Sequence, residues 1–291
     1  MPRFVTVTLN PALDLGCALP RLVPTHKLRV PGYQYDPGGG GLNVARVLHR
    51  LGADVRALVL LGGRGGDWLA SLLREEGVDF EDVPVAAETR VSLNLHEGET
   101  GLEYRIVPEG APLSPAEAEA ARVAVAAQTP HWLVASGSLA PGLSDDFYAV
   151  LAHGRGAARI AVDSSGRALP PLRGQGLDLL KLSQRELGLI SGGTVNDVEA
   201  GARALVADGT AAMVAVTLGE AGAVLVDGAS TIRRPARQVT VRSTVGAGDA
   251  FLAGLVLALD HGGSHAEALD FAIGISAAVV AADGSARLAP Q

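Results

Sequence analysis

The hydrophobic pattern along the chain alternates between two kinds of segment. Short β-branched runs predict strands at Arg3–Leu9, Val55–Leu61, Trp132–Ala135, Arg159–Val162 and Ala212–Leu218. Alanine-rich segments predict helices at Leu42–Leu51, Trp68–Glu76, Pro115–Gln128, Asp145–His153, Val198–Ala207 and Ala250–Leu259. This alternation indicates an α/β fold with a largely parallel sheet. Ligands of such sheets bind beyond the carboxyl ends of the strands, so the residues that follow each strand carry most of the functional information.

Two segments break the alternation. Residues 17–35 are rich in Pro, Arg and Lys without helical periodicity, and residues 89–107 read as two strands, Arg90–His96 and Leu102–Val107, around a turn at Gly98–Gly101. We expect them to form a small β-sheet lid inserted in a single domain of residues 1–291. Such a lid could exclude water, supply ligand contacts or pair with another subunit, and its exposed strands predict a homodimer.

Composition narrows the class of protein. A chain of 291 residues with 48% hydrophobic residues can bury a substantial core. The single cysteine, Cys17, cannot form an internal disulfide, the N-terminus lacks a signal-peptide pattern, and the apolar stretch Phe271–Ala282 is too short to cross a bilayer. We therefore expect a cytoplasmic protein with no membrane partner. A net charge of −7 without a basic cluster argues against a nucleic-acid partner.

The stretch Thr244–Asp249 is the most informative one. A β-branched run leads into it and an apolar helix leads out, so its glycines, Gly246 and Gly248, lie at a helix start whose amides and dipole favour a bound phosphate. A carboxylate beside bound phosphate is unfavourable unless it receives a reacting proton, which makes Asp249 a candidate for catalysis. The alternative is that Asp249 only caps the helix above a tight turn.

A second glycine cluster, Gly38–Gly41, precedes the predicted helix at Leu42–Leu51. Close approach of the backbone explains so many glycines, and a flexible loop is the alternative. Asn43, just after this cluster, and Asp14, just past the first strand, are short polar side chains suited to hydroxyl groups. Together they indicate a polyol ligand.

Positive charge for an anionic ligand is expected from the two insertions. Arg90 and Arg105 lie on opposite arms of the predicted hairpin, and Lys27 lies in the first insertion. Guanidinium groups match phosphate oxygens in a bidentate way, so the set indicates phosphate binding, although each residue alone reads as a surface residue. His26 and His96 show no metal-ligand or nucleophile spacing. The phosphate-loop and dinucleotide-binding fingerprints are absent from the sequence.

Taken together, these motifs resemble the ribokinase-like, or PfkB-type, carbohydrate kinases nearly end to end. The resemblance rests on Leu9–Asp14, the glycine cluster through Asn43, Ser136–Leu139, Val162–Gly166, Thr217–Gly219 and the signature Ser243–Asp249. It implies a three-layer αβα fold with a mostly parallel sheet. It also implies ATP as co-substrate, Mg²⁺ as cofactor and phosphoryl transfer to a sugar.

Within the family the chain is similar to the phosphosugar kinases. An all-glycine loop at Gly40, where 1-phosphofructokinases and tagatose-6-phosphate kinases usually carry Lys, and Tyr104-Arg105 favour the minor-type 6-phosphofructokinases. The expected reaction is conversion of fructose 6-phosphate to fructose 1,6-bisphosphate, with the other two phosphosugar kinases as alternatives. A sugar-phosphate or nucleotide sensor that has lost catalysis is the alternative of another class.

The resemblance also assigns roles by matching position. Asp249 is the expected base, with Gly246, Ala247 and Gly248 as the anion hole. The sugar is expected at Asp14, Gly38, Gly39, Asn43 and Ser138, and its phosphate at Lys27, Arg90 and Arg105. The nucleotide is expected at Lys181, Ser183, Thr217 and Gly219, with Glu186 ordering magnesium and its waters. Ser183 departs from the Asn of the family pattern, and because serine is shorter, a water is expected to bridge there.

Overall fold

The structure, a computed structural model, describes residues 2–282. Its large sheet contains β1 (Phe4–Thr8), β4 (Val55–Leu61), β5 (Asp79–Pro84), β8 (Trp132–Ser136), β9 (Arg159–Asp163), β10 (Leu177–Ser183), β11 (Ala211–Thr217), β12 (Ala223–Asp227) and β13 (Thr231–Arg234). A small sheet contains β2 (Ala12–Leu19), β3 (Gln34–Gly38), β6 (Arg90–Glu97) and β7 (Leu102–Ile106). The helices are α1 (Gly40–Arg50), α2 (Gly63–Glu75), α3 (Pro115–Ala126), α4 (Phe147–Gly154), α5 (Gln184–Ile190), α6 (Val198–Ala207), α7 (Ala247–Asp260) and α8 (His265–Val280), with short 3₁₀ turns at Gly166–Ala168, Pro170–Leu172 and Gly219–Ala221.

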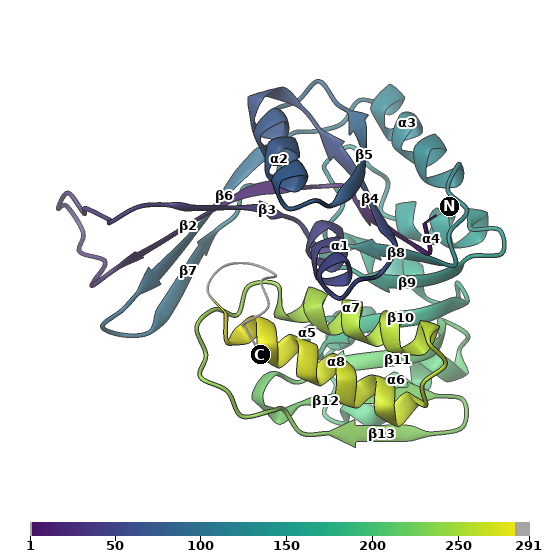
Figure 1. The fold of residues 1–291 in the computed structure, drawn as a ribbon. Coiled ribbons are helices and arrows are strands. Elements are labelled where there is room, and N and C mark those ends of the chain that lie inside the picture. Colours follow the sequence, from purple (N-terminus) through teal and green to yellow (C-terminus); the bar gives the residue numbers. More distant parts are fainter. Residues whose placement is uncertain (1, 283–291) are drawn as a thin grey trace.

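The large sheet has the strand order β13-β12-β11-β10-β9-β8-β1-β4-β5 (Figure 1). In this spatial order, each strand from β11 across the sheet to β5 pairs in parallel with the next one. Strands β12 and β13 add antiparallel pairs at the other edge, beyond β11. The largely parallel sheet predicted from the sequence is therefore confirmed. Because successive parallel strands end on the same side, the loops after β1, β8, β9 and β10 meet at one edge.

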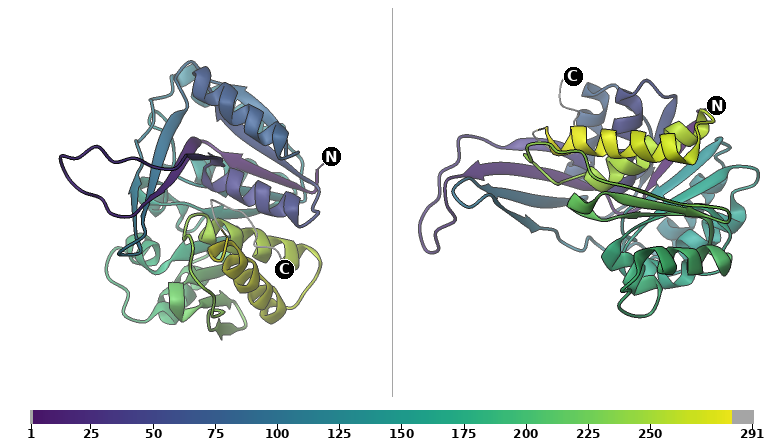
Figure 2. Two further views of the ribbon diagram at one scale, coloured as in Figure 1. Left: turned by 60° about the vertical axis from the view of Figure 1, so that its left-hand side comes forward. Right: turned by 90° about the horizontal axis from the view of Figure 1, so that it is seen from below.

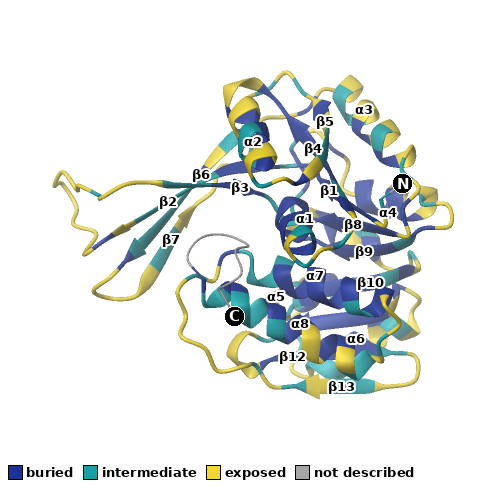
Figure 3. Cartoon of the chain, viewed as in Figure 1, coloured by how far each residue is buried: buried dark blue, intermediate teal, exposed yellow. Residues whose placement is uncertain are grey.

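Helices cover both faces of this sheet (Figure 2). Helices α1, α2, α7 and α8 contribute to one hydrophobic cluster, and α3, α4, α5 and α6 to the other. Strand residues alternate between the two clusters: Val55, Ala57 and Val59 of β4 pack on the first, and Leu58 and Leu60 on the second. This alternation follows from the two-residue period of side chains along a strand, and it confirms the three-layer αβα arrangement. The buried residues of the sheet and its helices are dark blue in Figure 3.

The small sheet projects from the body of the molecule with the order β3-β2-β6-β7 (Figure 1). The predicted hairpin is β6 and β7, with its turn at residues 98–101. The other pair, β2 and β3, begins at Ala12 and ends at Gly38, so the sheet reaches beyond the expected lid segments 17–35 and 89–107. Within the first segment, residues 20–33 form the loop between these two strands. We call the four strands and this loop the lid.

Four strands of the large sheet were not among those predicted: β5, β10, β12 and β13. Strand β10 is central and buried, but its leucine-rich sequence also fits a helix. Strands β5 and β13 lie at the two edges and carry exposed residues, so their composition lacks the buried β-branched run of a central strand. Pairing with a neighbour, rather than local pattern, establishes these elements.

The start of α1 is pressed against the ends of β1 and β8. Gly39 has a φ of 121°, which disfavours any residue with a side chain. A β-carbon at Gly40 would lie 2.4 Å from the Ser136 hydroxyl, and one at Gly41 would lie 2.4 Å from the Val7 carbonyl oxygen. Close backbone approach is thus observed, but at Gly40 and Gly41 the approach is to neighbouring strands.

Among the described residues, the helices are too short or too polar to cross a membrane.

Candidate active site

Asp249 lies in the first turn of α7 and is held by two donors from other elements. Its Oδ2 accepts a hydrogen bond from Nδ2 of Asn43 on α1 at 2.9 Å, and its Oδ1 accepts one from the Ser136 hydroxyl at the end of β8 at 3.2 Å. Gly246 adopts the left-handed conformation just before α7, with a φ of 80°. The carboxylate therefore has a fixed orientation next to the amides of the helix start.

A buried ion pair lies beside this turn. Nζ of Lys181 on β10 donates to Oδ2 of Asp163, at the end of β9, at 2.9 Å. A β-carbon on Gly248 would lie 2.8 Å from the same Nζ, which places the ammonium directly against the turn. Burial works against the charge on Lys181, but Asp163 outweighs it and raises the pKa of Lys181. Positive charge is thus fixed beside the amides of Gly246, Ala247 and Gly248.

The same surroundings change the acidity of Asp249. Burial and the neighbouring Asp163 carboxylate raise the pKa of Asp249 to about 6, against the hydrogen bonds from Asn43 and Ser136 and the charge of Lys181. An aspartate with this pKa accepts a proton more readily than an ordinary one and is still mostly ionised at neutral pH. This combination is suited to a general base.

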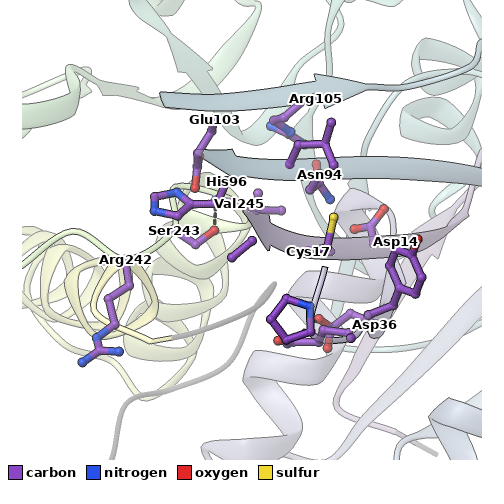
Figure 4. A pocket seen from close by; sticks show the side chains of 17 residues that line it. Asp14, Cys17, Asp36, Asn94, His96, Glu103, Arg105, Arg242, Ser243 and Val245 are labelled. Atoms are coloured by element: carbon purple, nitrogen blue, oxygen red, sulfur yellow. Dashed lines mark hydrogen bonds between the residues drawn. The ribbon is translucent and has the colours of Figure 1, made fainter. Parts of the chain in front are cut away.

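One face of the lid sheet lines a cavity of about 550 Å³ next to this turn (Figure 4). Polar residues alternate onto this face because the side-chain period of a strand is two. The register places Asn94 opposite Arg105 and His96 opposite Glu103. Oδ1 of Asn94 and Nδ1 of His96 are buried and have no protein hydrogen-bond partner among the described residues. Both residues line the cavity, although these two atoms are covered, and His96, interpreted from the sequence as an ordinary polar residue, therefore belongs to the site.

Asp14 lines the same cavity from β2. A β-carbon at Gly38 would lie 2.4 Å from its carboxylate, so the start of the glycine cluster and Asp14 form one surface. Its Oδ1 accepts a hydrogen bond from the Ser92 hydroxyl. Burial raises the pKa of Asp14, partly opposed by Ser92 and by the positive charge of Arg105. This arrangement brings together an acceptor for hydroxyl groups and a cation for an anionic group.

The remaining sequence candidates for the sugar phosphate lie in different settings. The guanidinium of Arg90 donates to the backbone carbonyls of Asn10, Pro11 and Pro108, so it fixes the chain around the base of the lid. Lys27 is exposed on the lid loop and is not among the residues that line the cavity. The Ser138 hydroxyl accepts a hydrogen bond from Asn10 just beyond β8.

A second cavity, of about 500 Å³, opens on the other side of the signature turn. It is lined by Thr217, the last residue of β11, by Gly219 just beyond it, and by Thr244, Ala247 and Gly248 of the turn. Ser243 and Val245 line the first cavity. The signature turn therefore lies between two cavities, and the amides at the start of α7 belong to their boundary.

Ser183 and Glu186 form the N-terminal cap of α5. Nitrogen of Glu186 donates to the Ser183 hydroxyl at 3.3 Å, and Oε2 of Glu186 accepts from the Ser183 nitrogen at 2.7 Å. The charge of Glu186 acts on both Asp163 and Lys181, so it faces the buried pair. No cluster of three or more potential metal-binding side chains occurs in residues 2–282. A single carboxylate that works with waters and substrate phosphates is nevertheless a usual arrangement for Mg²⁺, so Glu186 fits that role.

Sequence reasoning gave no role to Ser136, Asp163, Asn94 or Glu103. Ser136 and Asp163 belong to motifs that were recognised, but their contacts with Asp249 and Lys181 join residues far apart in sequence. Asn94 and Glu103 lie on the predicted hairpin, where alternation marks a shared face but does not show what that face covers. The register of the two hairpin strands, which pairs Asn94 with Arg105 and His96 with Glu103, was the signal that could have placed these residues on one face.

In this arrangement a buried carboxylate belongs to a turn that lies between two cavities, beside the amides of a helix start, as a two-substrate enzyme requires. The chain matches the pfkB family carbohydrate kinase model over residues 12–291. It is 38% identical to the ATP-dependent 6-phosphofructokinase isozyme 2 of Mycobacterium tuberculosis over 98% of this chain and 86% of that protein. It is 35% identical to the 1-phosphofructokinase of Rhodobacter capsulatus over 94% of this chain and 89% of that protein.

The fold is shared as well. The crystal structure of phosphofructokinase-2 from Escherichia coli in complex with substrates and products matches 99% of this chain and 95% of that chain, with a TM-score of 0.92 and 34% identity. The protein belongs to the PfkB family of carbohydrate kinases. The ribokinase-like fold expected from the resemblance is thereby confirmed.

The raised pKa of Asp249 predicts the acidic limb of the pH profile. A base must be unprotonated to work, so kcat/KM should be constant above neutral pH and fall about tenfold per pH unit below a pKa of about 6. Steady-state rates between pH 5 and 9, with circular dichroism at each pH to confirm folding, provide the measurement. A profile that stays flat down to pH 5 contradicts this assignment.

Asp249→Asn is the companion variant in that experiment. The amide keeps the shape of the carboxylate but accepts no proton, so turnover should fall by at least about 10²-fold while nucleotide affinity stays within a few fold. Its melting temperature should not decrease, because folding no longer buries a carboxylate that prefers to be neutral. Asp270→Asn, on the exposed face of α8 and paired with Arg234, is the matched control.

Proposed function

We propose that the protein transfers the γ-phosphoryl group of ATP to a ketohexose phosphate, and that fructose 6-phosphate is the acceptor. The observation that carries this proposal is the position of the signature turn between two cavities, one lined by Asp14 and Arg105 and the other by Thr217 and Gly219. A phosphoryl group that leaves the second cavity reaches the first at this turn. The similarity to 6-phosphofructokinases supports the acceptor.

The packing at Gly40 also supports this acceptor. The related kinases that act on fructose 1-phosphate or tagatose 6-phosphate usually carry lysine at this position. A β-carbon here would lie 2.4 Å from the Ser136 hydroxyl, which holds Asp249. A lysine would therefore displace a contact of the proposed base, which supports an acceptor that does not use a cation at this position.

The proposed mechanism relies mainly on positioning. Because the transition state of phosphoryl transfer is loose, the hydroxyl of the sugar needs a proton acceptor only late in the reaction, and Asp249 suffices. Hydrogen bonds from Asn43 and Ser136 fix the orientation of its carboxylate. The amides of Gly246, Ala247 and Gly248, with Lys181 beside them, stabilise the charge of the transferring group. Asp14, Gly38, Gly39, Asn43 and Ser138 stay the proposed sugar contacts.

A magnesium ion would be held by Glu186, through water, and would neutralise charge on the nucleotide phosphates when bound. Ser183 contributes by fixing the orientation of Glu186 through the helix cap. We therefore propose that Ser183 reaches the nucleotide through water.

The lid is proposed to exclude water from the reacting phosphate. The Thr244 hydroxyl of the signature turn donates to Oε2 of Glu103 on β7 at 2.8 Å, so the lid touches the turn directly. Water at this place would compete with the sugar for the phosphoryl group, and its exclusion suppresses hydrolysis.

Lys27 and Arg90 stay candidates for the sugar phosphate together with Arg105. We propose that the lid and the body, residues 1–291, act as one domain.

The other face of the lid is apolar and is proposed to cover the lid of a second copy. Leu93 pairs with Ile106 and Leu95 with Tyr104 on this face, and Ile106 and Leu102 are 58% and 54% exposed. Apolar side chains aligned on one face of a sheet favour burial against another surface, and an identical sheet offers a complementary one.

An acceptor panel tests the proposed function. In a coupled assay for ADP release, kcat/KM should be highest for fructose 6-phosphate, ahead of fructose 1-phosphate and tagatose 6-phosphate. A higher value for either of the others assigns the chain to that acceptor. ATP binding without ADP release for any acceptor contradicts the kinase proposal and identifies the chain as a sensor.

Arg105→Ala tests recognition of the acceptor's phosphate. A charge-assisted hydrogen bond is worth roughly 1.5–3 kcal/mol, so KM for fructose 6-phosphate should rise about tenfold or more while KM for unphosphorylated fructose changes little. Arg56→Ala, whose guanidinium pairs with Asp79 on the surface, is the matched control. An equal change for both sugars would show that Arg105 does not read the phosphate.

Ile106→Asp tests the lid dimer. Light scattering at micromolar concentration should give twice the 29.7 kDa chain mass for the parent protein and the single-chain mass for the variant. Val123→Asp places the same charge at a residue of α3 that is 52% exposed, and it should leave the dimer intact. A monomeric parent protein contradicts lid pairing.

A further inference from the structure

Arg46 is a fully buried cation directly behind the candidate site. It lies on α1, one turn after Asn43, and its side chain has no exposed surface. Its guanidinium binds Glu76 at the end of α2 through two hydrogen bonds, Nε to Oε2 at 2.8 Å and Nη2 to Oε1 at 2.6 Å. The site itself uses neither Arg46 nor Glu76 for contact with a ligand.

The other edge of the guanidinium faces the glycine cluster. Nη1 donates to the carbonyl oxygen of Pro37 at 3.1 Å and to Oδ1 of Asn43 at 3.5 Å, and Nη2 donates to Oδ1 of Asp36 at 3.2 Å. Asp36 and Pro37 belong to lid strand β3. One rigid group therefore joins the lid strand, α1 and α2.

The contact with Asn43, at 3.5 Å, and the contact of Asn43 with Asp249, at 2.9 Å, select the same direction for its amide. A guanidinium only donates hydrogen bonds, so the atom of Asn43 that faces it must be the oxygen. The NH₂ group then points away from Arg46 and donates to Asp249. With the amide reversed, its oxygen would face the Asp249 carboxylate and its NH₂ would face a cation, and both contacts would be repulsive.

We propose that Arg46 is a positioning residue for phosphoryl transfer, which acts through the Asn43 amide on the orientation of the Asp249 carboxylate. The inference rests on the proposed function. A buried cation between two carboxylates costs desolvation, and replacing such a whole ion cluster by apolar residues is often equally stable, so its presence suits a role in specifying one arrangement. The adjacent contacts with Asp36 and Pro37 hold the start of the glycine cluster in the same arrangement.

A double-mutant cycle tests this role. Arg46→Met should lower kcat about tenfold, because a small misalignment of the base has large effects on rate, and KM for ATP should stay within about twofold. In the Asn43→Ala background the same change should lower kcat by less than about twofold, since the group through which Arg46 acts is gone. A merely structural role gives the same loss in both backgrounds.

Arg50→Met is the matched control. Arg50 lies on the same helix and donates to the same carboxylate, Oε2 of Glu76, at 3.0 Å. Its replacement should leave kcat and the coupling to Asn43 unchanged. Arg46→Lys keeps the charge but lacks the planar fork, so it should fold and still lose kcat. If Arg46→Met does not fold by circular dichroism, the cycle is measured with Arg46→Lys.

The outcomes separate this inference from the proposed function. The cycle uses whichever acceptor gives the highest kcat/KM, so a different preferred sugar phosphate contradicts only the proposed acceptor. An active parent protein in which both Arg46 variants keep kcat within about twofold, or in which the losses are additive, overturns the inference alone. A chain that phosphorylates no sugar phosphate contradicts both.

Discussion

The contact of one carboxylate with donors from two distant parts of the chain is the constraint on which the site depends. Asp249 is separated by 206 residues from Asn43 and by 113 residues from Ser136. Both contacts require α1, α7 and the end of β8 to meet within hydrogen-bond distance. The glycines at the start of α1 permit this meeting, because side chains at Gly40 or Gly41 would collide with the strands beneath.

Burial then gives this carboxylate its chemistry. The neighbouring Asp163 adds to the effect of desolvation, whereas Lys181 and the two hydrogen bonds oppose it, and the resulting pKa is about 6. Stronger stabilisation of the ionised form would make Asp249 a weaker base, and weaker stabilisation would leave it protonated at neutral pH. The Asp163–Lys181 pair therefore serves two functions, since Lys181 also supplies positive charge beside the proposed anion hole.

Much of this fold could be predicted because its central strands are buried on both faces. The run Val55–Leu61 is apolar except for Arg56 and was predicted with the bounds that the structure has. The edge strand Thr231–Arg234 has no such run, and it exists because β12 offers a partner. The site divides in the same way. Asp249 is recognisable from its local motif, whereas the partners of Asp163 and Arg46, Lys181 and Glu76, come from other elements.

The departure from the family pattern at Ser183 follows from the same distinction between local and tertiary requirements. Asparagine and serine are both good N-cap residues, so either one satisfies the first turn of α5. Serine does so here and accepts from the backbone of Glu186, whose carboxylate caps it in return. The local requirement is met without the amide, and Glu186 keeps its position facing Asp163 and Lys181. The substitution therefore preserves the proposed metal-side carboxylate and changes only the reach of its neighbour toward the nucleotide.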